Sequence, residues 1–226
     1  MCSRYSLTSP PEAVRAIFAY RDRPNFPARY NIAPTQNVGV VCLDEEGERR
    51  LKPMRWGLLP AFVRDPKSAP TLINARAEGI STKPSFRHAF ARRRCLLPAD
   101  GFYEWTGPKT ARRPFLLRRR LGGLIGFAAI WERWRDREGG ETDTVAIITC
   151  AANATVTPLH DRMPVVLDPE HYAPWLDCEG TPVDAALALL LPAADDLLEA
   201  LEMDPKINDS RRDEPGLQEP LQPSLL

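Results

Sequence analysis

The sequence predicts a single α+β domain, in which a mostly antiparallel β-sheet is accompanied by a few peripheral helices. Residues 124–131 and 144–150 are continuous apolar runs of strand length, which are typical of the central strands of a buried sheet. Shorter β-rich runs alternate with turn residues along the rest of the chain. With 226 residues, of which 43% are hydrophobic, the chain is long enough to bury one large core.

The other elements follow from apolar patterning and from proline and glycine. Residues 9–12 (SPPE) indicate a helix start after a first short strand, with Ser9 as its cap and prolines in its first turn. Residues 38–43 and 49–56 predict a hairpin around a turn at 44–47. Further strands are predicted at 95–98, 102–105, 114–119 and 163–167, helices at 84–92, 169–176 and 183–191, and loops at 30–34 and 57–70.

No repeat or convincing linker divides the chain. From residue 204 onwards the sequence has many prolines and no periodicity, which is typical of irregular or partly disordered segments. We therefore expect one domain over residues 1–210, followed by an irregular C-terminal tail over residues 211–226.

Composition argues against several classes of protein. The five cysteines are scattered, without CxxC spacing, and there are only three histidines, so we expect no disulfide framework, no metal site and no cofactor. No apolar run reaches the roughly 18 residues that span a bilayer. The N-terminus lacks an apolar signal segment, so the expected location is the cytoplasm.

Charge is divided unevenly along the chain. Residues 1–120 hold 23 Lys and Arg against 10 Asp and Glu, whereas residues 121–226 hold 7 against 20, and the net charge is zero. Such asymmetry is a hint of nucleic-acid contact. The alternative is that the two halves neutralise each other across an ordinary protein surface.

Cys2 is the first candidate for chemistry. Removal of Met1, which is usual before a small residue, would give Cys2 a free α-amine beside its thiol. Both groups are partly nucleophilic near neutral pH, with reference pKa values of about 7.7–8.0 and about 8.5. Such a pair can act as a nucleophile with its own base or trap an aldehyde. The alternative is an ordinary small residue that opens a strand.

Three further polar positions interrupt apolar patterning. Asn74 and Arg76 are two residues apart on an extended segment and so share one face, where they could hold a sugar oxygen and a phosphate. Glu104 lies between two aromatic residues, where poor solvation would raise its pKa and suit it to proton transfer. His160 lies in a proline-bounded loop with an acid and an arginine, as a candidate proton shuttle. Each position also has a structural alternative. Asn74 and Arg76 would close a strand end with side-chain hydrogen bonds. Glu104 would pair with an arginine, and His160 would serve only in packing.

Basic and aromatic residues form a fourth set. Positive charge along a groove, with aromatic rings for stacking, is the general design of proteins that bind single-stranded nucleic acid. The members of this set are Arg4, Arg29, Arg55, Trp56, Phe62 and the arginines at 92–94. For the last three, a solvated helix end is the better interpretation.

These segments together resemble the SRAP family, the SOS-response-associated peptidases or abasic-site processing proteins. The matching motifs occur in the family's order. They are MCSRY at 1–5, RYNIAP at 29–34, WGL at 56–58, INARAE at 73–78, residues 95–105, LHDRMP at 159–164 and KIND at 206–209. The family usually has glycine where this chain has Ser3.

The resemblance implies a curved, barrel-like sheet and a protein that senses abasic sites in single-stranded DNA. It implies that Cys2 is the nucleophile, that Asn74 orients it, and that Glu104 and His160 form an acid/base pair. The product would be a thiazolidine crosslink, with possible lyase and peptidase activities in the SOS response. The implied DNA contacts are Arg4, Arg76 and Arg162 on phosphates, Asn31 and Pro34 lining a channel, and Trp56 and Phe62 as aromatic contacts, with Phe62 as a wedge.

Two other functions remain open from the sequence. An N-terminal-cysteine peptidase or amidohydrolase would share the amine–thiol pair but needs an oxyanion hole, and no glycine-rich segment clearly offers one. A non-catalytic single-strand binding module would not need Cys2. The expected partner is single-stranded DNA that contains abasic sites, bound by a monomer without membrane contact and close to the nucleoid after damage.

Overall fold

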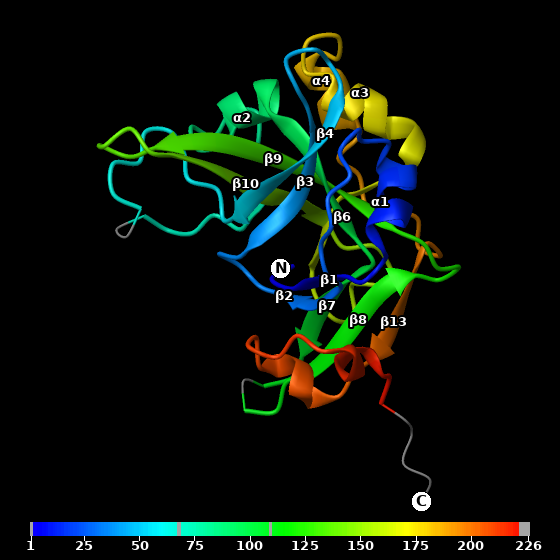
Figure 1. Ribbon diagram of the computed structural model, residues 1–226. Coiled ribbons are helices and arrows are strands. Elements are labelled where there is room, and N and C mark those ends of the chain that lie inside the picture. Colours follow the sequence, from blue (N-terminus) through cyan, green and yellow to red (C-terminus); the bar gives the residue numbers. More distant parts are fainter. Residues whose placement is uncertain (1, 67–68, 109, 222–226) are drawn as a thin grey trace, which may run out of the picture.

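Two β-sheets with short helices around them make up the computed structural model, which describes residues 2–66, 69–108 and 110–221 (Figure 1). The strands are β1 (Tyr5–Leu7), β2 (Arg29–Ile32), β3 (Asn37–Leu43), β4 (Arg49–Trp56), β5 (Asn74–Arg76), β6 (Arg94–Ala99), β7 (Gly101–Thr106), β8 (Arg113–Arg119), β9 (Ile125–Arg135), β10 (Glu141–Ala151), β11 (Arg162–Pro164), β12 (Val166–Leu167) and β13 (Leu198–Glu202). The helices are α1 (Pro11–Phe18), α2 (Arg87–Arg92), α3 (Tyr172–Leu176) and α4 (Val183–Ala188), with 3-10 turns η1 (Pro169–His171), η2 (Pro205–Asn208) and η3 (Pro215–Gln218).

Five strands of the larger sheet close into a barrel. The order β10-β4-β3-β6-β9 returns to β10 through the pairing of β9 with β10. Four of these pairings are antiparallel, and the pairing of β10 with β4 is parallel. The predicted α+β domain with a mostly antiparallel, barrel-like sheet is therefore confirmed.

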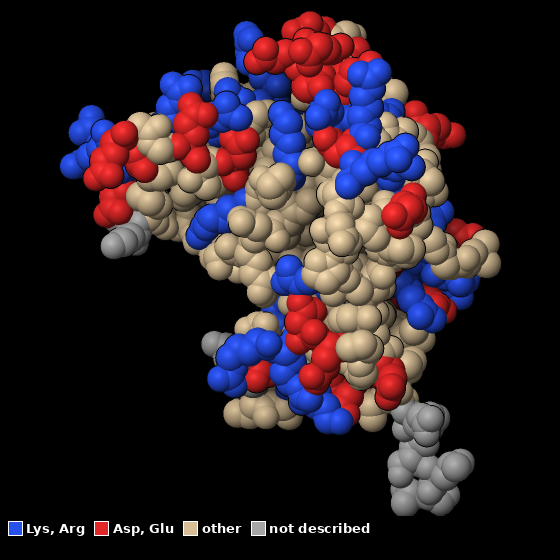
Figure 2. Space-filling view, viewed as in Figure 1, with Lys and Arg blue, Asp and Glu red and all other residues tan. Residues whose placement is uncertain are grey.

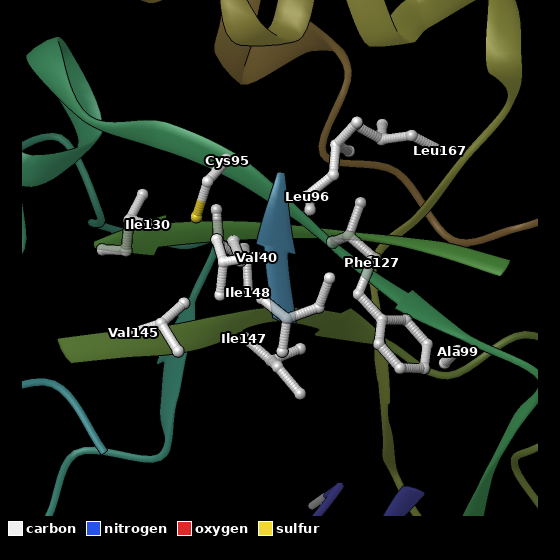
Figure 3. Packing of buried hydrophobic residues seen from close by; sticks show 14 of the residues in the cluster. Val40, Cys95, Leu96, Ala99, Phe127, Ile130, Val145, Ile147, Ile148 and Leu167 are labelled. Atoms are coloured by element: carbon white, nitrogen blue, oxygen red, sulfur yellow. The ribbon is translucent and has the colours of Figure 1, made fainter. Parts of the chain in front are cut away.

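The barrel is filled by the apolar runs that the sequence marks as central strands. Val40, Phe127 and Ile147 have no exposed surface, share one face of the sheet by their pairing register and come from three different strands (Figure 3). Burial of a side chain of this size is worth about 1.5–3 kcal/mol. The barrel is thus a packed core, and functional groups must lie at its ends or on the second sheet.

The second sheet carries the N-terminal segment. Its strand order is β13-β8-β7-β1-β2, and all of its pairings are antiparallel. Tyr5 of β1 packs edge-on against Trp56 of β4, with ring centroids 5.3 Å apart, and so joins the two sheets. The N-terminal segment is therefore held between the sheets, where Figure 1 shows the N-terminus.

Several local predictions differ from the structure. Residues 29–32 form strand β2, which overlaps the loop expected at 30–34, and β13 lies where the sequence predicts no strand. Ser9 does not cap α1, because its hydroxyl donates to Asp100 and the N-cap is Pro10. The segment from residue 204 contains η2 and η3 and buries Leu217. The boundary at residue 210 stays a prediction, and residues 222–226 lie outside the described part.

Ion pairs connect the basic first half to the acidic second half. Acidic and basic side chains are intermixed on the face in Figure 2. Pairs that join the halves include Arg29–Asp213, Arg93–Glu132, Arg113–Glu202 and Arg118–Glu199. Mutual neutralisation therefore accounts for part of the charge asymmetry. Over the described ranges, no helix is long and apolar enough to cross a bilayer.

Candidate active site

Cys2 lies just before β1 and has no exposed surface. Its thiol donates to the carbonyl oxygen of Arg4 at 3.7 Å, and its own carbonyl oxygen accepts a hydrogen bond from Asn74 Nδ2 at 2.8 Å. Burial raises the pKa of the Cys2 thiol well above its ordinary value, and the negative charge of Glu104 raises it further. The thiol is therefore protonated at neutral pH.

Asn74 comes from β5, a three-residue strand that pairs in parallel with β10. Its neighbour Ala75 is fully buried, whereas Arg76 is exposed, so the alternation of the strand turns Asn74 and Arg76 toward the same side. The carbonyl oxygen of the Asn74 side chain is buried and accepts no hydrogen bond from the described residues. It is thus placed to receive one from a ligand.

Glu104 lies on β7 and is 3% exposed. Burial raises its carboxyl pKa, while the positive charge of protonated His160 acts in the opposite direction. Glu104 lies close enough to both Cys2 and His160 for their charges to interact, so the three side chains are near one another. A carboxyl group with a raised pKa can donate and accept protons near neutral pH.

His160 has a partner for each of its protonation states. The backbone N–H of Arg162 donates to Nδ1 at 2.9 Å, which requires that nitrogen to be unprotonated. A carboxylate oxygen of Asp161 lies 2.7 Å from the same Nδ1 and suits the protonated ring. The two contacts require different protonation of Nδ1 and so cannot form together. We take the contact with the Arg162 N–H to describe the neutral ring, whose proton is on Nε2. A neutral imidazole can accept a proton, and a protonated one can donate it.

Arg162 forms strong contacts within the protein. Its guanidinium makes two hydrogen bonds with the Glu78 carboxylate, at 2.6 and 2.8 Å, and one with the carbonyl oxygen of Thr149 at 2.6 Å. The Nε atom is buried and makes no hydrogen bond with the described residues. The loop that carries His160 is thereby fixed to β10 and to the end of β5.

Arg4 and Asn31 are occupied by the C-terminal segment. Arg4 donates to the Asn31 side chain at 2.7 Å and to the carbonyl oxygen of Ile207 at 3.2 Å, and its guanidinium lies over the Trp105 ring. Asn31 has no exposed surface, and its amide donates to three carbonyl oxygens of residues 207–212. Asn31 is therefore covered by the C-terminal segment in this structure, and its place along a DNA channel stays a prediction.

The predicted aromatic contacts divide into a buried and an exposed residue. Trp56 has no exposed surface, and its indole N–H donates to the carbonyl oxygen of Ile73 at 2.9 Å, so it belongs to the core rather than to an open DNA surface. Phe62 is 65% exposed and can stack or wedge. Pro34 is half-buried.

A polar pocket of about 480 Å³ opens beside the N-terminal segment. Ser3 lines it, together with Arg4, Trp105, Arg112 and Arg113, so an anionic ligand would find several cations there. Ser3 does not have a positive φ, which means that its backbone has no need for the glycine that is usual in the family. Among the described residues, no cluster of His, Cys, Asp or Glu could hold a metal ion.

The sequence hypothesis missed three participants. Thr149 and Glu78 hold Arg162, and Trp105 supports Arg4. Glu78 and Trp105 lie inside or at the end of matching motifs, and that adjacency was the available signal. The sequence around Thr149 does not mark it as part of the site, because Thr149 lies within an apolar run. Only the pairing of β10 with β11 places it near Arg162.

Comparison with known proteins finds similar chains over most of the sequence. The chain is 36% identical over 222 residues to the abasic site processing protein YoqW of Bacillus subtilis, covering 96% of this chain and 98% of that one. It is 34% identical to YedK of Escherichia coli, a protein of the same designation, covering 78% and 79% of the two chains. It is 29% identical to HMCES of Xenopus tropicalis, also an abasic site processing protein, covering 85% and 70%.

Solved structures share the fold. A Bordetella bronchiseptica protein superposes with a TM-score of 0.78 at 28% identity, covering 90% of this chain and all of that one. A Bacteroides thetaiotaomicron protein superposes with a TM-score of 0.82 at 24% identity, covering 92% and 99%. The family model for "SOS response associated peptidase (SRAP)" matches residues 1–210. The chain therefore belongs to the SRAP family.

Proposed function

We propose that this protein processes abasic sites in single-stranded DNA and bonds to them through Cys2 once Met1 has been removed. The main support is that Cys2, Asn74, Glu104 and His160, from four distant segments, meet at one place. The names of the relatives, abasic site processing proteins, support the same class of substrate.

The reaction begins with the aldehyde of the abasic deoxyribose. His160 donates a proton to the ring oxygen as the bond between that oxygen and C1′ breaks, and the C1′ hydroxyl loses its proton to water, which gives the open-chain aldehyde. The neutral α-amine of Cys2 adds to the aldehyde carbon, and loss of one water gives a Schiff base. The raised pKa of the Cys2 thiol keeps it protonated at this stage, which leaves the first attack to the amine.

Ring closure completes the bond. The Cys2 sulfur adds to the imine carbon, its proton passes to the nitrogen, and a five-membered thiazolidine results. Glu104 relays protons between amine, carbinol oxygen and thiol, as its buried position and raised pKa allow. Asn74 holds the Cys2 carbonyl oxygen and so fixes the direction of both nucleophiles. The Schiff base alone would permit β-elimination, which ring closure suppresses.

The DNA strand would be held by Arg76, which is exposed, by Arg162, and by Phe62 as an exposed aromatic ring. Arg4 contributes charge at the polar pocket beside Ser3. An abasic nucleotide has no base to unstack, so the enzyme reaches the sugar without that cost.

The test is a denaturing gel of the mature protein incubated with single-stranded DNA that holds one abasic site. A shifted covalent band is expected, absent with Cys2→Ala and retained with Cys178→Ala, a half-buried cysteine elsewhere. Mass spectrometry must show a free Cys2 amine. Wild-type protein with a free Cys2 but no band would disprove the proposal, and equal binding of abasic and intact strands by Cys2→Ala and wild type would favour a non-catalytic module.

A further inference from the structure

The guanidinium of Arg162 is covered by a carboxylate that is itself open to solvent. The Arg162 side chain is 11% exposed, whereas that of Glu78, which pairs with it, is 60% exposed. Both oxygens of Glu78 take part in the pair. Arg162 is also held from behind by Thr149, so the arginine is fixed while Glu78 is free to swing outward.

Glu78 also faces a second arginine. Arg76 precedes it by two residues and is exposed at the end of β5. The hydrogen bonds from Arg162, with the charge of Arg76 as a smaller contribution, lower the pKa of the Glu78 carboxyl below its ordinary value. An anion is thus stabilised beside two arginines at the edge of the site that contains Asn74 and His160.

A phosphodiester presents the same two-oxygen geometry to arginine as a carboxylate does. We propose that Glu78 occupies the place of a DNA phosphate on Arg162, so that a strand binds only by displacing this carboxylate. This inference rests on the proposed function, in which Arg76 and Arg162 hold the backbone.

The displacement has a consequence for selectivity. Exchange of one ion pair for another adds little net affinity. The phosphate loses water when it binds Arg162, while the released Glu78 carboxylate regains water, and the two ion pairs are similar in strength. Intact single strands are therefore held weakly and released. Strands with an abasic site are retained by the covalent bond to Cys2, which does not depend on this exchange.

The test compares Glu78→Gln with the wild type in binding an intact, fluorescently labelled single strand, measured by anisotropy at several salt concentrations. Removal of the competing charge should tighten binding by about tenfold or more and steepen the decline of affinity with salt. Asp143→Asn is the matched control, because Asp143 also pairs through both oxygens, with Arg133, at 2.7 and 3.0 Å. It should leave affinity unchanged.

Two further measurements separate the possible results. In the background of Arg162→Gln, the Glu78→Gln change should lose most of its effect, because no guanidinium remains to be released. Weaker binding by Glu78→Gln, with an unchanged melting temperature, would overturn the inference and make Glu78 a positioning residue for Arg162. Absence of binding by every variant would overturn it too. The covalent band with abasic DNA reports separately on the proposed function.

Discussion

Glu104 is a carboxyl group that the fold holds where ionisation is costly. Its 3% exposure raises its pKa, and the folded state therefore binds a proton more tightly than the unfolded chain does. The stability of the protein then falls as pH rises from the ordinary glutamate pKa through the raised one. Such a cost is typical of active-site groups, because an easily solvated carboxylate would be a poor proton donor near neutral pH.

Replacement of Glu104 with Gln should stabilise the protein at neutral pH while it slows the chemistry. We expect a melting temperature a few degrees higher at pH 8, and a difference that vanishes near pH 4, where both chains are neutral at this position. Crosslinking should slow by about 10²-fold or more. Melting curves at several pH values, with gel time courses, check both parts; a lower melting temperature at pH 8 would contradict the burial argument.

Replacement of Asn74 with Ala should reduce the rate of crosslinking more than it reduces stability. The lost hydrogen bond to the Cys2 carbonyl oxygen contributes about 0.5–1.5 kcal/mol to folding, whereas the freed N-terminal residue loses its orientation. Urea unfolding and single-turnover crosslinking would be compared with Asn37→Ala, an exposed position on β3. Equal rates for the two variants would rule out an orienting role.

The sequence motifs predict which individual residues belong to the candidate site, but they do not predict all of the contacts that these residues make. Local pattern and resemblance predict Cys2, Asn74, Glu104 and His160. In the structure Asn74 donates to the Cys2 carbonyl oxygen, and Glu104 lies near enough to Cys2 and His160 for their charges to interact. The burial of Asn31 could not be predicted, because its partners lie about 180 residues further along the chain.

Strand β7 is the element that places Glu104, and its first residue is a close-contact glycine. A Cβ on Gly101 would lie 2.7 Å from the carbonyl oxygen of Leu117 and 2.8 Å from a Leu116 methyl group. Gly101→Ala should therefore push β7 away from β8, cost about 1–3 kcal/mol of stability and slow crosslinking. Chemical denaturation would measure the cost, with Gly216→Ala as the control, because nothing lies within 4 Å of its added Cβ. Equal stabilities would refute the close contact.

Strands and helices could be predicted where the sequence signal is local. Prediction failed where pairing with a distant strand determines the structure. The apolar runs of β9 and β10, and the hairpin of β3 and β4, followed from composition and turns. Strand β13 contains Leu, Glu and Ala, which do not favour strands, and it forms because β8 offers an edge. Pairing with a distant edge leaves no mark within a short window of sequence.

On the scale of the whole molecule, residues 211–221 close one side of the structure. Leu217 is 1% exposed and packs with Tyr103 and Ile207, while Asp213 pairs with Arg29. Truncation after residue 210 should lower stability by about 2–5 kcal/mol, the range for loss of a buried leucine. Calorimetry of the shortened and full chains measures this, and Leu217→Ala tests the leucine alone. An unchanged melting temperature would place the domain boundary at residue 210, as the sequence predicts.

The burial of Cys2 also bears on the order of events during synthesis of the protein. Strand β1 is enclosed through its pairing with β7, whose residues 101–106 are made roughly a hundred residues after the first. Until β7 has left the ribosome, the N-terminus has no sheet to enter and is open to an aminopeptidase. The proposed removal of Met1 is therefore expected to occur on the nascent chain, before β1 pairs with β7 and Cys2 is enclosed. In a chain that keeps Met1, the Cys2 nitrogen is part of a peptide bond and cannot form the proposed Schiff base.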